Sequence, residues 1–197
     1  VSTLINALRH RGPDGEGVFS RGPVTVAHRR LAIIDVDAGK QPLCNEDTSI
    51  WVTFNGEIYN YRDLRDQLIT LGHTFRTHSD TEVLVHAYEQ WGPPFLTRLR
   101  GMFALAIVDY RKQIVLLARD PLGIKPLYYT GKHSCFAFAS EISPLLSLPW
   151  VDASISLPAV DLFLRFQYIP GPNTVYEGVL SLSPGHYLEI PFAGTLT

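Results

Sequence analysis

An asparagine and a glycine stand side by side at Asn55-Gly56, between the apolar-rich segments 51–54 and 58–59. An amide side chain next to a glycine N–H can stabilise an oxyanion, and a ligand can approach a glycine backbone closely. The same dipeptide between two apolar segments also predicts a two-residue β-hairpin. Spacing alone favours the hairpin, and both interpretations stay open at this point.

Three charged residues have both a structural and a ligand-binding interpretation. Arg29 and Arg30 lie in a strand-like segment, where an arginine usually keeps its charge in solvent. A planar guanidinium also suits bidentate binding of a carboxylate. Asp80 stands in the first turn of a predicted helix, where a carboxylate complements the helix dipole by default. It could instead meet a ligand ammonium group.

Other chemistry-bearing residues favour structural roles. The charge pair Arg119-Asp120 sits in a Pro/Gly loop, which is most often structural. The histidines have no metal-ligand spacing, and Cys44 and Cys135 are too few for a disulfide framework or a zinc site, so we expect no metal. No dinucleotide, Walker or nucleophile-elbow motif is present in the sequence.

Composition bounds the class of protein. The 197 residues carry 17 basic and 19 acidic side chains, a net charge of −2 that argues against nucleic-acid binding. Hydrophobic residues make up 46% and charged residues 18%, as in one globular domain. No apolar run of about 18 residues predicts a membrane span, and the first residues do not read as a secretory signal. With Cys44 and Cys135 as the only cysteines, we expect a reducing, cytoplasmic compartment.

Hydrophobic periodicity and turn residues predict the elements that position these side chains. We expect short helices around residues 4–8 and 157–166, and a Gly/Pro loop over residues 11–17. Asn60 is expected to cap a helix that Gly72 stops, and Ser79 to open another with capping-box spacing to Glu82. Strands are predicted at 24–28, 30–34, 50–54, 102–110, 113–118, 126–130 and 135–139. Strands joined by tight turns, with helices between groups of them, predict an α+β antiparallel fold.

Several motifs, taken in order, resemble one family. They are His10–Gly15, His28–Asp35, Phe54–Asn60, His78–Glu82, Gly101–Ala104, Ala118–Gly123 and Ser183–Tyr187. Together they resemble the glutaminase domain of glutamine-dependent asparagine synthetases, a class II amidotransferase of the N-terminal-nucleophile type. The resemblance covers nearly the whole chain, 1–197, and favours the oxyanion interpretation of Asn55-Gly56 over the hairpin.

The resemblance implies a fold and a site. The fold would be a four-layer αββα sandwich of two antiparallel sheets. Asn55 and Gly56 would form the oxyanion hole, Arg30 would bind the α-carboxylate of L-glutamine, and Asp80 with Glu57 would receive its α-ammonium group. Backbone groups of the segment after Arg30 would complete the pocket, namely Leu31, Ala32, Ile33 and Ile34. No cofactor is expected in this domain.

The family's nucleophile is an N-terminal cysteine, whereas residue 1 here is Val1. We expect that cysteine and a first strand upstream in a parent protein, and no glutamine hydrolysis by the 197 residues alone. A glutaminase-like scaffold without activity, as in β-lactam synthetases, is one alternative, and a glutaminase serving another acceptor is a second.

In asparagine synthetases, ammonia passes to a C-terminal domain that activates aspartate with ATP and Mg²⁺. The resemblance implies such a domain in the parent protein. This sequence has no S-G-G-x-D-S-type loop, so we expect asparagine formation only of the parent protein. A homodimer is a further expected assembly.

Overall fold

A computed structural model describes residues 2–31 and 40–193. Its centre is a five-stranded antiparallel sheet in the order β10-β6-β5-β4-β3. The strands of this sheet are β3 (Leu43–Cys44), β4 (Ile50–Ile58), β5 (Gly101–Asp109), β6 (Ile114–Arg119) and β10 (Tyr187–Pro191).

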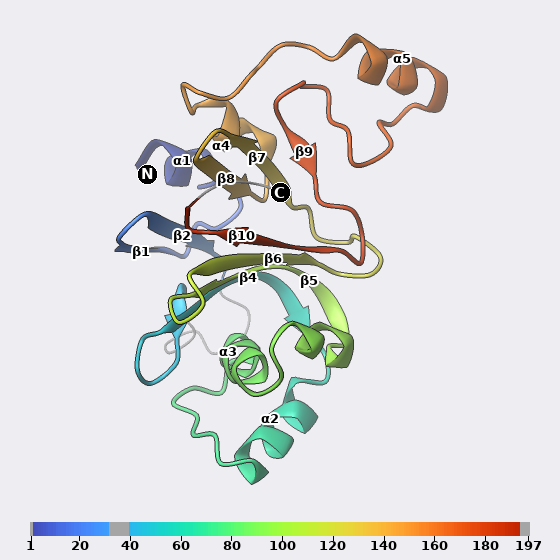
Figure 1. Cartoon of the computed structure of the whole chain (residues 1–197). Coiled ribbons are helices and arrows are strands. Elements are labelled where there is room, and N and C mark those ends of the chain that lie inside the picture. The colour runs from blue at the N-terminus through green and yellow to red at the C-terminus, as the bar shows by residue number, and fades with distance from the viewer. Residues whose placement is uncertain (1, 32–39, 194–197) are drawn as a thin grey trace.

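Helices cover one face of this sheet (Figure 1). They are α2 (Tyr61–Thr70), α3 (Asp80–Trp91) and the 3₁₀ helix η1 (Pro93–Arg98). Leu64 and Leu68 of α2 and Val83 and Leu84 of α3 are buried in one cluster with apolar residues of β4 and β5. Burial of such side chains drives this packing, because each contributes about 1.5–3 kcal/mol relative to an exposed position.

The other face of the sheet is covered by two smaller antiparallel groups of strands. One group pairs β1 (Gly15–Arg21) with β2 (Val24–Arg30), and the other has the order β8-β7-β9. The bounds of the second group are β7 (Tyr128–Lys132), β8 (Cys135–Ala139) and β9 (Leu180–Ser181). A second apolar cluster lies between these layers, with Val26, Ala106, Leu117 and Leu127 among its buried members.

Two short helices, α1 (Ser2–Ala7) and α4 (Ile142–Leu146), lie outside the smaller strand groups (Figure 1). The order of layers is therefore helix, sheet, sheet, helix, which confirms the predicted αββα sandwich. One detail differs from the prediction. Within the described residues, β2 and β8 do not pair, so the second sheet layer consists of two separate pieces.

Most predicted elements are present, and the differences have local causes. The strand prediction at 135–139 and the helix prediction at 157–166 match β8 and α5 (Leu157–Phe166). Strand β1 was missed, because we expected a Gly/Pro loop over residues 11–17. Of the predicted strand 30–34, Arg30 is the last residue of β2, Leu31 follows that strand, and residues 32–34 lie outside the described residues.

The predicted caps are only partly right. Ser79 caps α3, and its Oγ accepts a hydrogen bond from the Thr81 N–H at 3.1 Å. Glu82 does not complete a capping box, because its carboxylate accepts from the backbone N–H groups of Arg76 and Thr77 instead. Asn60 precedes α2 without capping it, since its side chain bonds to the backbone around Arg98 and Arg100.

Helix α5 projects from the layered body at the top of Figure 1. Its only buried residue is Ala159, whereas Leu157, Phe163, Leu164 and Phe166 are exposed. None of the helices in the described part of the chain has both the length and the apolar character needed to cross a membrane.

Candidate functional site

Strand β4 runs without interruption through Asn55 and Gly56, so the predicted hairpin at this dipeptide is wrong. Gly56 pairs with Phe103 of β5. A Cβ atom at Gly56 would collide with the Met102 carbonyl and come within 2.8 Å of the Phe103 Cα, so only glycine fits there. Position 56 is therefore a glycine because β5 approaches its backbone closely, and not because the chain turns there.

The backbone just before Asn55 is held by Gln41, a residue that the sequence analysis missed. The Phe54 N–H donates to Gln41 Oε1 at 2.6 Å, and Gln41 Nε2 donates to the Phe54 carbonyl at 3.1 Å. The side chain thus pairs with β4 as a neighbouring strand would. A lone glutamine before a proline gives no sequence signal for this contact.

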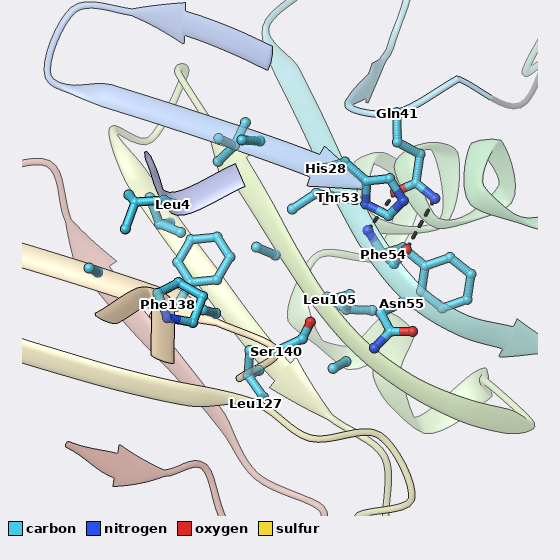
Figure 2. A pocket seen from close by; sticks show the side chains of 18 of the residues that line it. Leu4, His28, Gln41, Thr53, Phe54, Asn55, Leu105, Leu127, Phe138 and Ser140 are labelled. Atoms are coloured by element: carbon cyan, nitrogen blue, oxygen red, sulfur yellow. Dashed lines mark hydrogen bonds between the residues drawn. The ribbon is translucent and has the colours of Figure 1, made fainter. Parts of the chain in front are cut away.

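A cavity of about 720 Å³ opens between β2 and β8 and reaches Asn55 and Gly56. Figure 2 shows His28 of β2, Asn55 of β4 and Phe138 of β8 around it. The walls are mostly apolar away from β4, with residues of α1, β5 and α4 among them. The side-chain amide of Asn55 makes no hydrogen bond within the described residues and is available to a ligand.

Two arginines at the end of β2, Arg29 and Arg30, line this cavity. Arg30 lies there, and its charge adds to the effect of burial on His28. Burial, and secondly the Arg30 charge, lower the pKa of His28 from 6.5 to about 4. His28 is therefore neutral at pH 7, and its Nδ1 forms a hydrogen bond of 3.1 Å with the Thr53 hydroxyl. Arg30 places a guanidinium on the same wall as His28.

Two carboxylates line the same cavity. Asp80 is buried at the start of α3, and its Oδ2 accepts a hydrogen bond from the Ile58 N–H at 3.1 Å. Burial raises the pKa of Asp80, and the nearby Glu57 charge raises it further against the backbone hydrogen bonds. Because two carboxylates lie close together in a poorly solvated place, a ligand cation would relieve their repulsion.

The structure brings most of the predicted site residues together. Arg30, Leu31, Asn55, Gly56, Glu57 and Asp80 all line the cavity. The predicted contributions of Ala32, Ile33 and Ile34 fall outside the described residues. An amide donor, a guanidinium and two carboxylates around one cavity suit a small molecule that carries both a carboxylate and an ammonium group.

The two other charged motifs are structural. Asp120 accepts hydrogen bonds from the N–H groups of Phe103, Leu122, Ile124 and Lys125, as the structural interpretation of this loop predicted. Arg29 is not solvated, contrary to the default expectation for this pair, because its guanidinium binds the Ile5 carbonyl and Asn6 of α1. Arg29 therefore links β2 to α1 by hydrogen bonds.

Comparison with known proteins agrees with this geometry. A family model for a glutamine amidotransferase domain matches residues 1–197. The chain belongs to the glutamine amidotransferase domain family. Among the relatives of this amidotransferase domain, asparagine synthetase [glutamine-hydrolyzing] 1 of Bacillus subtilis (strain 168) is 44% identical over 197 residues, which cover 100% of the chain and 31% of that protein. Asparagine synthetase [glutamine-hydrolyzing] 2 of Arabidopsis thaliana is 48% identical over 146 residues, covering 74% of the chain and 25% of that protein.

Two solved structures share the fold of the amidotransferase domain at low identity. One, described as the allosteric regulatory enzyme of purine biosynthesis, has a TM-score of 0.65 at 22% identity, over 98% of this chain and 44% of that one. Glutamine phosphoribosylpyrophosphate amidotransferase from B. subtilis has a TM-score of 0.61 at 23% identity, over 73% of this chain and 39% of that one. The resemblance inferred from the motifs is confirmed. The domain spans about a third or less of the relatives' length.

Proposed function

We propose that this domain hydrolyses the side-chain amide of L-glutamine and supplies the ammonia to an ATP-dependent synthetase domain of the same parent protein. The observation that carries the proposal is the grouping of Arg30, Asn55, Gly56, Glu57 and Asp80 around one cavity. Free glutamine carries an α-carboxylate, an α-ammonium group and a neutral amide. For each of these three groups, at least one of the five residues has the matching charge or hydrogen-bonding capacity.

Each residue has a distinct part in the proposed reaction. Arg30 binds the α-carboxylate, and Asp80 with Glu57 binds the α-ammonium group. When a nucleophile attacks the amide carbon, the carbonyl oxygen becomes an oxyanion that the Asn55 amide and the Gly56 N–H stabilise. Ammonia leaves from the resulting tetrahedral intermediate, and water then releases glutamate from the acyl-enzyme.

We further propose that the nucleophile is an N-terminal cysteine carried on a strand of the parent protein that enters the cavity. Within the described residues, β2 and β8 each pair on one side only, and the cavity lies between them. Unpaired strand edges favour the addition of a strand, and the apolar floor from β5 suits its side chains. A cysteine at its end would meet the oxyanion donors Asn55 and Gly56.

The test is an assay of glutamate release by the complete protein encoded by the gene. We expect a cysteine after the initiator methionine, loss of glutaminase activity when it is replaced by alanine, and weaker glutamine binding in Arg30→Ala. A complete protein that has no such cysteine and neither binds nor hydrolyses glutamine would overturn the proposal. It would favour the alternative of a scaffold domain without activity.

The acceptor is proposed from the relatives, whose names identify them as asparagine synthetases. We propose aspartate as the acceptor, activated with ATP and Mg²⁺ by the second domain, in the cytoplasm. This chain has no pyrophosphate-binding loop of the S-G-G-x-D-S type, so no step with ATP is assigned to its residues. Asparagine formation from glutamine by the complete protein tests this proposal, and amidation of a different acceptor would overturn it.

The exposed apolar residues of α5 are the proposed contact with that second domain. Phe163 and Leu164 are 47% and 68% exposed, in a helix with one buried residue. Exposed apolar patches mark interaction surfaces, and relatives more than three times as long as this chain supply a partner within the same polypeptide. Replacing both residues by serine should reduce coupling of glutaminase to synthetase activity in the complete protein without reducing glutamine binding.

A further inference from the structure

Two histidines and a glutamate converge away from the glutamine cavity. His73 follows α2, whereas His86 and Glu89 lie one turn apart on α3. The Nδ1 atoms of the histidines are 3.3 Å apart, and Glu89 Oε2 lies 3.6 Å from His86 Nδ1 and 3.9 Å from His73 Nδ1. Among the described residues, this is the one group of three such side chains close enough to share a metal ion.

The outer nitrogens of the two imidazoles have different surroundings. His73 Nε2 lies 3.0 Å from Gln90 Oε1, and His86 Nε2 lies 3.8 Å from carboxylate oxygens of both Glu82 and Glu46. The hydrogen bond to Gln90 favours a proton on His73 Nε2, whereas His86 Nε2 is buried and makes no hydrogen bond within the described residues. The two Nδ1 atoms lie 3.3 Å apart. In metal-binding histidines the second nitrogen usually donates to a carbonyl or carboxylate, and His73 has this arrangement with the Gln90 side-chain oxygen.

The ligand oxygen of Glu89 is positioned in the same way. Its other oxygen, Oε1, accepts hydrogen bonds from Asn45 at 3.1 Å and from Arg111 at 3.0 Å. These contacts orient the carboxylate and leave Oε2 toward the histidines. His86 is 1% exposed and packs edge-on against the Phe75 ring, so its imidazole has little freedom to turn away.

We propose that His73, His86 and Glu89 bind a divalent metal ion of the Zn²⁺ type. Ligands at about 2.0–2.1 Å in tetrahedral geometry lie about 3.3–3.4 Å apart, which the two Nδ1 atoms already satisfy. The Glu89 oxygen needs to move closer by a few tenths of an ångström. Its side chain is 19% exposed and that of His73 is 14% exposed, so the site is accessible to the ion and to a water ligand.

The metal would fasten the loop between α2 and α3. His73 lies in that loop, and Ser79 and Asp80 at its end begin α3 at the glutamine cavity. The site was not expected from the sequence, because the two histidines are 13 residues apart and have no ligand spacing. A cation is also favoured by the charges, since the carboxylates of Glu46, Glu82 and Glu89 all approach His86.

The test measures Zn²⁺ binding by the tag-free, chelator-treated protein with isothermal titration calorimetry and thermal unfolding. We expect one ion per chain and a higher Tm with Zn²⁺. We also expect visible absorption by tetrahedral Co²⁺, because Co²⁺ substitutes in such sites. His73→Gln and Glu89→Gln should each weaken binding by about tenfold or more, as the loss of a ligand costs at least as much as that of an outer partner.

His133→Asn is the matched control, because His133 is an exposed histidine in the β7–β8 turn with a positive φ that asparagine tolerates. Its Zn²⁺ affinity should equal that of the unsubstituted protein. The competing explanation is an imidazole pair that shares one proton, with the Gln90 amide reversed. No Tm shift and no Co²⁺ absorption, or equal affinity in His73→Gln, would establish that explanation and overturn the proposal.

Discussion

The side chain of Gln41 forms two hydrogen bonds with the backbone of Phe54, one to its N–H and one from its amide to the carbonyl. Phe54 directly precedes Asn55, the proposed oxyanion donor. Gln41 is therefore a positioning residue for the site, although it lies in a loop.

Replacing Gln41 by alanine should lower the free energy of unfolding by about 1–3 kcal/mol, because two buried backbone groups of β4 lose their partner. Urea denaturation measures this loss. Gln67→Ala is the control, since Gln67 is exposed on α2 and its side chain makes no hydrogen bond within the described residues. Equal stability of the two variants would contradict the role of Gln41.

Asn55→Ala should lower the kcat of the complete, active protein by about 10²–10³-fold with little change in glutamine binding, because the amide acts on charge that develops in the transition state. Arg30→Ala should instead raise KM, because the α-carboxylate binds equally in ground and transition states. Steady-state kinetics of glutamate release separate the two parameters. Equal effects on both parameters in both variants would count against these roles.

Asp80→Asn should be at least as stable as the unsubstituted protein at pH 7. Because burial and Glu57 raise the pKa of Asp80, folding favours its protonated form. Protonation of Asp80 therefore contributes to the free energy of unfolding below about pH 3.9, the pKa of an aspartate in the unfolded chain. This contribution is lost as the pH rises through the higher pKa that Asp80 has in the folded protein. Glutamine affinity should nevertheless fall, since asparagine carries no charge for the ammonium group.

Unfolding free energies and glutamine titrations at pH 7 test both parts of this prediction. Asp66→Asn, at an exposed position on α2, is the control and should change neither. A large destabilisation by Asp80→Asn would mean that the carboxylate stabilises the fold.

Protonation of His28 should destabilise the protein in mild acid. The pKa of His28 is about 4 in the folded protein, below its ordinary value of 6.5. The contribution of neutral His28 to the free energy of unfolding is therefore complete above pH 6.5 and is lost as the pH falls toward 4. The loss should reach up to about 3 kcal/mol, from about 1.4 kcal/mol per pKa unit. His28→Asn keeps a polar group near Thr53 and should remove this pH dependence, measured as the difference in unfolding free energy between the two proteins.

Asp120→Ala should cost more than about 3 kcal/mol of unfolding free energy, because four backbone N–H groups lose a buried acceptor. Burial alone would raise the pKa of Asp120, but these four donors hold it below the ordinary value. Asp120→Asn keeps one oxygen and should cost less. Denaturant titration compares them, and an alanine variant as stable as the asparagine variant would contradict the structural role.

The sequence by itself determined the elements whose pattern is local. Residue composition predicted the strand at 135–139, which is rich in aromatic residues, and the helix at 157–166 was also predicted, because both signals depend on neighbours a few residues away. The motifs also predicted the family, the αββα fold and the cavity positions of Arg30, Asn55, Glu57 and Asp80. Hydrophobic pattern alone did not find β1, whose burial is only partial.

Only the tertiary structure decided which distant residues meet. Asn-Gly is a turn signal, yet at Gly56 the close approach of the Met102 carbonyl on β5 requires a glycine inside a strand. Gln41 reaches β4, and His73 reaches His86, through loops whose paths no local pattern specifies. The physical reason is that strand pairing and side-chain hydrogen bonds join residues far apart in sequence, and their geometry is fixed only when the two apolar layers pack.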